Sequence, residues 1–226
     1  MEYIYSIADY IEIIKKISHY GVNGFREDVS LYFRGESKDY KETSGIPNIA
    51  RKQWFANGNE PFVFRECERR MPQDFSNCKT TFEKLVLMQH YGIPTRLLDV
   101  SMDSLEALFF SLYLDPKSKS VDFNDSVVLI YEVPKKSILN WHSDKVSIIS
   151  NIAVYDYDDL NIKTLPNSAA DPDREIFNNN ESVKHLLHEI KSEKPHFKDW
   201  IKKEDLESIY CVHPLLNNSR IKAQQG

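Results

Sequence analysis

Hydrophobic residues recur every three or four positions near the start of the chain. Between residues 3 and 20 this spacing is kept by Ile4, Ile7, Ile11, Ile14 and Ile17, which is typical of an amphipathic helix. Ser6 is suited to cap its first turn, and Gly21 and Gly24 are expected to end it. We therefore predict that residues 1–26 form an amphipathic helical lead-in.

Other stretches carry the patterns of strands. Apolar and polar side chains alternate over residues 29–37, and this alternation predicts a strand that ends near Arg34-Gly35. The apolar and β-branched content of residues 126–134 predicts a central strand. Two further short strands are predicted over residues 145–150 and 208–212.

The remaining periodic segments predict helices, over residues 62–70, 81–91, 101–115 and 181–190. Thr80 or Thr81 precedes the second of these, with Glu83 placed as the acidic partner of a capping box. Ser101 is expected to cap the third helix. The apolar side chains of that helix predict a buried stripe, formed by Leu105, Leu108, Phe109 and Leu112.

These elements mix strands and helices without strict alternation, which favours an α+β fold. We expect one domain over residues 27–226, with a mixed or antiparallel central sheet flanked by helices. Residues 155–181 are acidic and rich in Asn, so they are predicted to form an exposed insertion. Residues 219–225 are expected to form a final helical turn or the entry to a strand.

Composition narrows the class of protein. The chain has 226 residues, 41% of them hydrophobic, and a net charge of −5, a balance opposite to that of most non-specific nucleic-acid binders. No apolar run reaches membrane-spanning length and no signal pattern opens the chain. We therefore expect a cytoplasmic protein without a membrane partner. Its three cysteines form no Cys-x-x-Cys pair, which argues against a disulfide framework or zinc ribbon.

The stretch MQHYGIPTRLLDVS, residues 88–101, holds the densest group of polar side chains. Polar groups beside a buried core must be hydrogen-bonded or used in function. His90, at a helix C-terminus, is suited to act as a general acid or hydrogen-bond donor, or simply to cap carbonyls. Arg96 beside Thr95 is a ligand candidate, whereas Asp99 is expected to brace the following turn.

Arg34 is the other candidate. An arginine at a strand end, next to a glycine, can hold a phosphate or a carboxylate bidentately. The alternative is a structural salt bridge to Asp99 or to a surface acid. The sequence contains no phosphate-binding loop, zinc-protease, zinc-deaminase or nucleophile-elbow motif, and residues 154–162 lack the Gly and Glu of a calcium loop. No metal is expected.

Taken in order, several motifs resemble the FRG domain family, which is named for its Phe/Tyr-Arg-Gly signature. The matching stretches are YFRGES (32–37), GIPNIAR (45–51), FRECERRMP (64–72), QHYGIPTRLLDVSMDSLEALFFS (89–111), VVLIYEV (127–133) and RIKAQQG (220–226). The chain departs from the family at Val100, where an aromatic residue is usual. It also stops after Gln225-Gly226, where family members commonly continue with an aromatic residue and a strand, so a truncated chain is expected.

More distantly, the pattern resembles ADP-ribosyltransferases, enzymes that use NAD. In that resemblance Arg34 matches a first-strand residue that binds the dinucleotide, Thr95 or Ser101 a hydroxyl on a second strand, and Gln224 a late polar residue. It implies Arg34, His90 and Gln224 as catalytic residues. The implied cofactor-binding residues are Arg34, Tyr91, Thr95, Arg96 and Ser101. The chain has no Glu-x-Glu pair near its C-terminus, and Gln224 can orient a ribose but cannot act as a base.

Two functions follow from the resemblance. The first is an NAD-using, ADP-ribosyltransferase-like toxin or phage-defence effector, as expected of a family found mainly in bacteria, phages and mobile elements. Such an effector would act on a protein or nucleic-acid target and would have a neutralising partner protein. The alternative is a non-catalytic sensor module, in which the same pocket binds a nucleotide, a nucleic acid or a phage protein without turnover.

Overall fold

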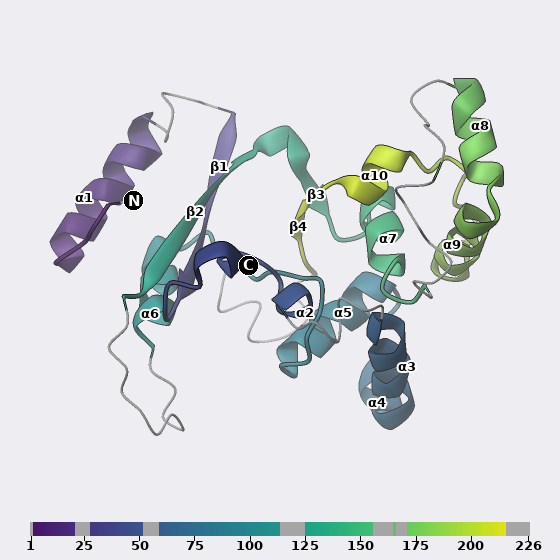
Figure 1. The fold of residues 1–226 in the computed structure, drawn as a ribbon, viewed down its shortest axis with the longest axis horizontal. Helices are drawn as coiled ribbons and strands as arrows, with labels where there is room; N and C mark the ends of the chain where they lie inside the picture. Colours follow the sequence, from purple (N-terminus) through teal and green to yellow (C-terminus); the bar gives the residue numbers. More distant parts are fainter. Residues whose placement is uncertain are drawn as a thin grey trace. The chain divides into compact units, whose positions relative to one another are not determined.

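A computed structural model describes residues 2–20, 28–51, 59–113, 125–155, 165 and 171–215. Within these ranges the fold is α+β, as the sequence predicts (Figure 1). The longer elements are α1 (Ile7–Tyr20), β1 (Val29–Glu36), α3 (Glu60–Arg70), α5 (Thr81–His90), α6 (Ser104–Leu112), β2 (Val127–Pro134), α7 (Asp144–Asn151), α8 (Asp171–Asn179) and α9 (Glu181–Glu193). Shorter ones are α2 (Asn48–Arg51), α4 (Pro72–Phe75), β3 (Ile138–Asn140), α10 (Lys203–Glu207) and β4 (Cys211–His213).

The chain divides into two compact units. The first contains the described residues of 1–45 and 99–138, and the second those of 46–98 and 139–215. Each unit is built from segments that are distant in sequence.

An antiparallel pair of strands forms the centre of the first unit. In β1 and β2, Val29 lies opposite Pro134 and Glu36 lies opposite Val127. A β-bridge between Phe33 and Ser101, with N–O distances of 2.7 and 2.8 Å, adds the loop before α6 to the other edge of β1. Both predicted strands are thus confirmed, and so is the antiparallel arrangement.

Helix α6 packs on β1 through its smallest side chains. A Cβ atom added to Gly35 would lie 1.9 Å from the carbonyl oxygen of Ala107 and 2.5 Å from the backbone nitrogen of Ser111. Ala107 and Ser111 are buried, whereas three of the four residues predicted to form the buried stripe are not: Leu105, Phe109 and Leu112 are 51%, 59% and 61% exposed, and only Leu108 is half-buried. That prediction is wrong, because only a face of small residues lets the helix approach the strand backbone so closely.

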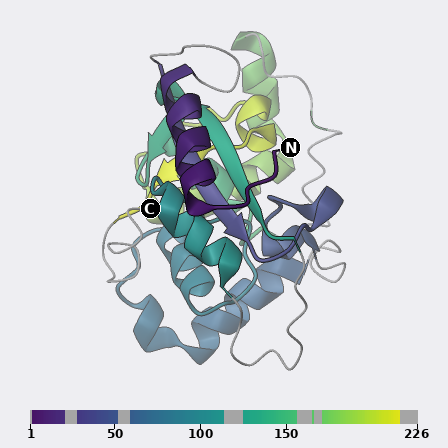
Figure 2. The same cartoon turned by 90° about the vertical axis from the view of Figure 1, so that its left-hand side faces the viewer.

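The cap of α6 also differs from the prediction. Asp103, not Ser101, is the capping residue, and its carboxylate accepts hydrogen bonds from the backbone nitrogens of Leu105 and Glu106. At the other end of the unit, Ser6 caps α1 as predicted, accepting from the backbone nitrogen of Asp9. Figure 2 shows α1 in front of the strands of this unit. Tyr10 of α1 contacts the rest of the unit, because its buried phenol donates to the carbonyl of Ser104 over 2.6 Å.

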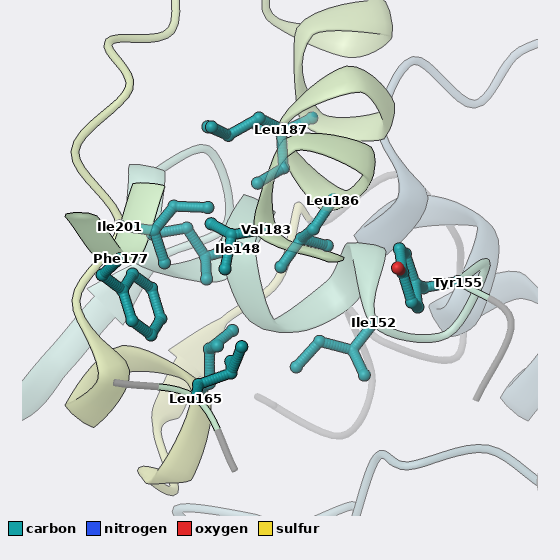
Figure 3. Close-up of a cluster of buried hydrophobic side chains, with 11 residues drawn as sticks. Ile148, Ile152, Tyr155, Leu165, Phe177, Val183, Leu186, Leu187 and Ile201 are labelled. Carbon is teal, nitrogen blue, oxygen red and sulfur yellow. The ribbon is translucent and has the colours of Figure 1, made fainter. Parts of the chain in front are cut away.

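The second unit contains two hydrophobic clusters. The larger one draws on α7, α8 and α9 and on residues beyond them (Figure 3): Ile148, Ile152, Tyr155, Leu165, Phe177, Val183, Leu186, Leu187, Ile190, Ile201 and Leu206. The smaller one joins α3, α4 and α5, with Phe64, Cys67, Phe75, Leu85, Met88 and Ala153. Thr80 caps α5 as predicted, accepting from the backbone nitrogen of Glu83, and Gly92 follows the helix with φ of +74°.

Two predicted segments differ in this unit. Residues 145–150, predicted as a strand from their β-branched content, form helix α7, which begins at a cap from Ser143 to Val146. Tertiary packing outweighs β propensity here, because the helix buries Val146 and Ile148 in the unit. Of the predicted insertion 155–181, the described part includes helix α8, whose Phe177 is fully buried, so this part is integral to the core.

Near the C-terminal end, the strand predicted over 208–212 is found at β4, paired with β3. The segment 219–225 lies outside the described residues.

Candidate functional site

Arg34 lies in β1 and is fixed at two points. Its Nε atom is 3.3 Å from the carboxylate of Glu36, and its Nη1 atom donates to the backbone carbonyl of Asp99 over 2.8 Å. The side chain of Arg34 is 20% exposed, so it is neither free in solvent nor buried. Its position follows from strand geometry, because residues 34 and 36 point to the same side of β1.

Glu36 is the buried centre of this arrangement. The residue is 3% exposed, and besides Arg34 its carboxylate accepts hydrogen bonds from the Ser44 hydroxyl and the Gly45 backbone nitrogen, at 2.5 and 3.2 Å. Gly45 makes this possible with φ of +68°, a conformation that favours glycine. Glu36 therefore ties the loop after β1 to the arginine.

The second amino group of Arg34 has no partner among the described residues. Nη2 makes no hydrogen bond within the described parts of the chain, whereas Nε and Nη1 are both engaged. An arginine that is held by Nε and one amino group and offers its other amino group can bind an anion with little further loss of side-chain entropy. This geometry combines the two alternatives open from the sequence: Arg34 has structural partners, and it still presents a donor.

Ser101, predicted to bind the cofactor, has a structural role in the same unit. Its hydroxyl donates to the carboxylate of Glu106 over 2.5 Å and accepts from the backbone nitrogen of Asp103 over 3.0 Å. The residue is only 9% exposed. Its hydroxyl fixes the entry into α6, and a ligand-binding role for it has no support in this geometry.

A comparison with known protein families identifies part of the chain. Residues 29–120 match the family model of the FRG domain. The chain therefore carries an FRG domain. No curated protein and no solved structure matches the chain. The extension of the resemblance to residue 226 and the likeness to ADP-ribosyltransferases stay predictions.

The FRG match also spans residues 88–101, which lie mainly in the second unit, and here Thr95 is a buried structural residue. Its side chain is fully inaccessible, and its hydroxyl donates to the amide oxygen of Gln89 over 2.7 Å and accepts from the backbone nitrogen of Leu97 over 3.1 Å. These bonds satisfy the polar group inside the turn that follows α5. The predicted contact between Thr95 and a cofactor thus has no support in the structure.

Arg96 is likewise engaged. Its guanidinium forms a bidentate ion pair with the buried carboxylate of Glu60, with Nε at 3.0 Å and Nη2 also in contact. Nη1 reaches the carbonyl of Ile149 at 3.4 Å. The geometry makes Arg96 a brace between α3, the turn and α7, in place of the predicted ligand contact.

His90 and Tyr91 are exposed members of the motif. His90 ends α5, and its ring lies edge-on to the ring of Tyr91, with 5.7 Å between centroids. The Tyr91 hydroxyl donates to Asp74 over 3.1 Å, and this hydrogen bond, with the charge of Asp74, raises the pKa of the phenol. Tyr91 is therefore a neutral donor at physiological pH. The imidazole of His90 makes no hydrogen bond to the described residues, so it is the one member of the motif whose polar atoms are not already engaged.

The predicted site residues are thus distributed over both units. Arg34 and Ser101 belong to the first, and His90, Tyr91, Thr95 and Arg96 belong to the second. Gln224 lies outside the described residues. The prediction that these residues line one cleft stays a prediction.

Sequence reasoning missed the two acids that hold the arginines. The position of Glu36 beside Arg34 could be predicted, because Glu36 lies two residues after Arg34 in a strand and its side chain is therefore on the same side. The pairing of Glu60 with Arg96 could not be predicted, because it depends on how α3 packs against the turn 36 positions later.

The remaining chemistry is limited in the described ranges. They contain no group of three or more His, Cys, Asp or Glu side chains arranged to hold a metal ion, and no helix among them is long and apolar enough to cross a membrane. Cys67 and Cys78 are free thiols whose pKa values are raised, chiefly by burial. A raised pKa keeps a thiol protonated and poorly nucleophilic.

Proposed function

We propose that the FRG domain binds NAD through Arg34 and uses it for ADP-ribosyl transfer, as a toxin or phage-defence effector. The observation that carries the proposal is the guanidinium of Arg34, fixed by Glu36 and the carbonyl of Asp99 while Nη2 stays available. The biological setting and the transfer reaction come from the family resemblance.

The held arginine suits a pyrophosphate. A guanidinium makes charge-assisted hydrogen bonds to phosphate oxygens, and its planar shape fixes the direction of approach. Because two of its nitrogens are already bound within the unit, Arg34 presents a charge whose position is set before the ligand arrives. Such preorganisation lowers the entropic cost of binding.

The chemistry after binding is bond cleavage at the nicotinamide ribose. The C–N bond to nicotinamide breaks, positive charge develops on the ribose, and the new bond forms to a nucleophile on the target, which loses a proton. A group that orients the ribose or stabilises the developing charge would speed this step. The resemblance assigns that role to Gln224, with His90 as a further candidate.

A non-catalytic nucleotide-binding module is the second candidate, and one observation favours it. Glu36, the carboxylate beside Arg34, is buried and already accepts hydrogen bonds from Ser44, Gly45 and Arg34. It is therefore not placed to act as a catalytic acid or to stabilise a cationic ribose. With Arg34 alone, the unit would bind a dinucleotide without turning it over.

Incubation of the purified protein with NAD separates these functions. The enzyme releases nicotinamide and adds an ADP-ribose mass to a macromolecule supplied in cell extract. A binding module is stabilised thermally by NAD and forms no product. Nicotinamide is measured by chromatography, and the midpoint of thermal unfolding is measured with and without NAD.

The variant Arg34→Lys tests the anchor itself. It keeps a positive charge beside Glu36 but loses the planar fork, so we expect NAD binding or turnover to fall about 10- to 100-fold, the usual range for losing a hydrogen bond to a charged group. Arg69→Lys is the matched control, because Arg69 is an exposed arginine paired with Glu66 on α3. If Arg34→Lys behaves like the wild type, Arg34 is not the anchor.

A further inference from the structure

The second unit carries a basic, aromatic groove outside the matched FRG residues. It has a volume of about 860 Å³ and is lined by seven residues of one segment, 194–203, with the sequence KPHFKDWIKK, and by Asp144, Lys145, Ile148 and Asp205. Five of these ten residues are Lys or His and two are aromatic. In a chain with a net charge of −5, such a local concentration of cations marks a surface for an anionic ligand.

The segment is held in a fixed shape although it is not helical. Ile201 is fully buried in the larger hydrophobic cluster, beside Ile148 and Phe177 (Figure 3). The side-chain amide of Asn178 forms two hydrogen bonds with the backbone of Ile201. It accepts from the nitrogen and donates to the carbonyl, each over 2.9 Å. The neighbours of Ile201 in sequence therefore face solvent from a rigid support.

Those neighbours include two lysines without acidic partners. Lys198 and Lys202 line the groove, are exposed, and have no ion pair with any described residue. Lys194 differs, because its ammonium group lies 3.0 Å from Asp144 and also donates to the carbonyl of His142. The unpaired charges thus lie on either side of position 200.

Trp200 supplies an aromatic surface between the two lysines. The residue is 55% exposed, although the guanidinium of Arg174 lies 4.5 Å from the centroid of its ring. A ring backed by a cation is a platform on which a flat group can stack.

We propose that this groove binds single-stranded nucleic acid, with phosphates on Lys198 and Lys202 and a base stacked on Trp200. Alternation of cations with an exposed ring is the pattern of single-strand binding surfaces, where charge follows the backbone and aromatic residues hold the bases. A purely electrostatic partner, such as an acidic peptide, would leave the indole unused, and a duplex would keep its bases out of reach. The proposal does not depend on the function assigned to Arg34.

Fluorescence anisotropy of the full chain with a labelled 15-nucleotide oligothymidylate tests the site. The wild type should bind with an affinity that falls as salt rises. Lys198→Glu combined with Lys202→Glu should weaken binding at least tenfold and flatten the salt dependence. Lys41→Glu combined with Lys184→Glu is the charge-matched control, because both lysines are exposed, lie outside the groove and are paired with acids, Asp39 and Glu181.

Trp200→Ala separates stacking from charge. It should lower affinity about 5- to 150-fold, the range for losing one base–aromatic stack, and leave the salt slope unchanged. Phe62→Ala, which removes a 60% exposed aromatic ring elsewhere in the unit, should bind like the wild type. Circular dichroism confirms that each variant is folded.

Three results would overturn the proposal: no salt-dependent binding of the oligonucleotide by the wild type, equal affinity of wild type and Trp200→Ala, or a polyglutamate peptide or the matching duplex bound as tightly as the single strand. The peptide result would assign the groove to an acidic protein partner instead.

Discussion

At the scale of single residues, the ion pair between Arg34 and Glu36 fixes the position of the arginine. Glu36 is buried among three donors, and Arg34 supplies the charge that balances it. The position of both side chains on one side of β1 could be predicted from the alternation of the strand. The carboxylate that pairs with Arg34 could not be predicted. The choice of Glu36 over Asp99 depends on how the loop that contains Ser44 folds back onto β1.

Replacing Glu36 by Gln should destabilise the protein by about 2–4 kcal/mol, because it leaves the arginine without its compensating charge and weakens the bonds to Ser44 and Gly45. Urea unfolding followed by circular dichroism measures the loss. Glu66→Gln is the control, since Glu66 pairs with Arg69 and Arg70 on an exposed helix face, and it should leave the unfolding midpoint almost unchanged. Equal midpoints for both variants would contradict the role of Glu36.

At the scale of elements, α6 shows why a hydrophobic pattern can mislead. Three of the four large residues of its predicted stripe are exposed, and the helix packs through Ala107 and Ser111 against Gly35. The existence of the helix could be predicted from its periodicity. Its buried face could not, because that face is chosen by the absence of a side chain at position 35 on another element.

Gly35→Ala should therefore destabilise the first unit by at least 1–3 kcal/mol, as overpacking does. The new methyl group would overlap the backbone of Ala107, and backbone cannot move aside as a flexible side chain can. Phe109→Ala, a larger change at a 59% exposed position of α6, should cost less in the same urea titration. The reverse order would show that α6 does not pack on β1 in this way.

Tyr10 links helix α1 to the rest of its unit. Burial raises the pKa of its phenol, and the folded protein therefore favours the protonated form that donates to Ser104. A group whose pKa is raised on folding contributes its stability below its unfolded pKa, near 10, and loses it as pH rises through the folded value.

Tyr10→Phe should consequently cost about 1 kcal/mol at neutral pH, the usual value of one hydrogen bond. It should also reduce the loss of stability between pH 9 and 11, because the ionisation that opposes folding is removed. Thermal unfolding across this pH range checks both effects. An unchanged alkaline profile in the variant would mean that Tyr10 does not contribute to it.

At the scale of the whole molecule, the FRG match and the packing divide the chain differently. The match covers residues 29–120 as one stretch, whereas the two compact units exchange segments at residues 45–46, 98–99 and 138–139. The α+β class and most elements could be predicted from local patterns. The division into two units could not be predicted, because it depends on which apolar faces pack together. Both hydrophobic clusters, the larger and the smaller, form in the second unit.

This division also explains the mixed outcome for the motif QHYGIPTR. Its strong sequence signal comes largely from architecture: Thr95 and Arg96 hold a turn together in the second unit. Arg34 in the first unit has a second amino group without a partner among the described residues, and His90 is exposed at the end of α5. A dense polar motif can thus point to a family, while its individual residues need a structure before a role can be assigned.

Isothermal titration of NAD into the wild type and into Arg34→Lys is the most direct test of the proposed function. The account predicts measurable binding by the wild type and an affinity at least tenfold lower for the variant, with both proteins equally folded. Equal affinities, or no binding of NAD by the wild type, would contradict the claim that Arg34 is the nucleotide anchor of this FRG domain.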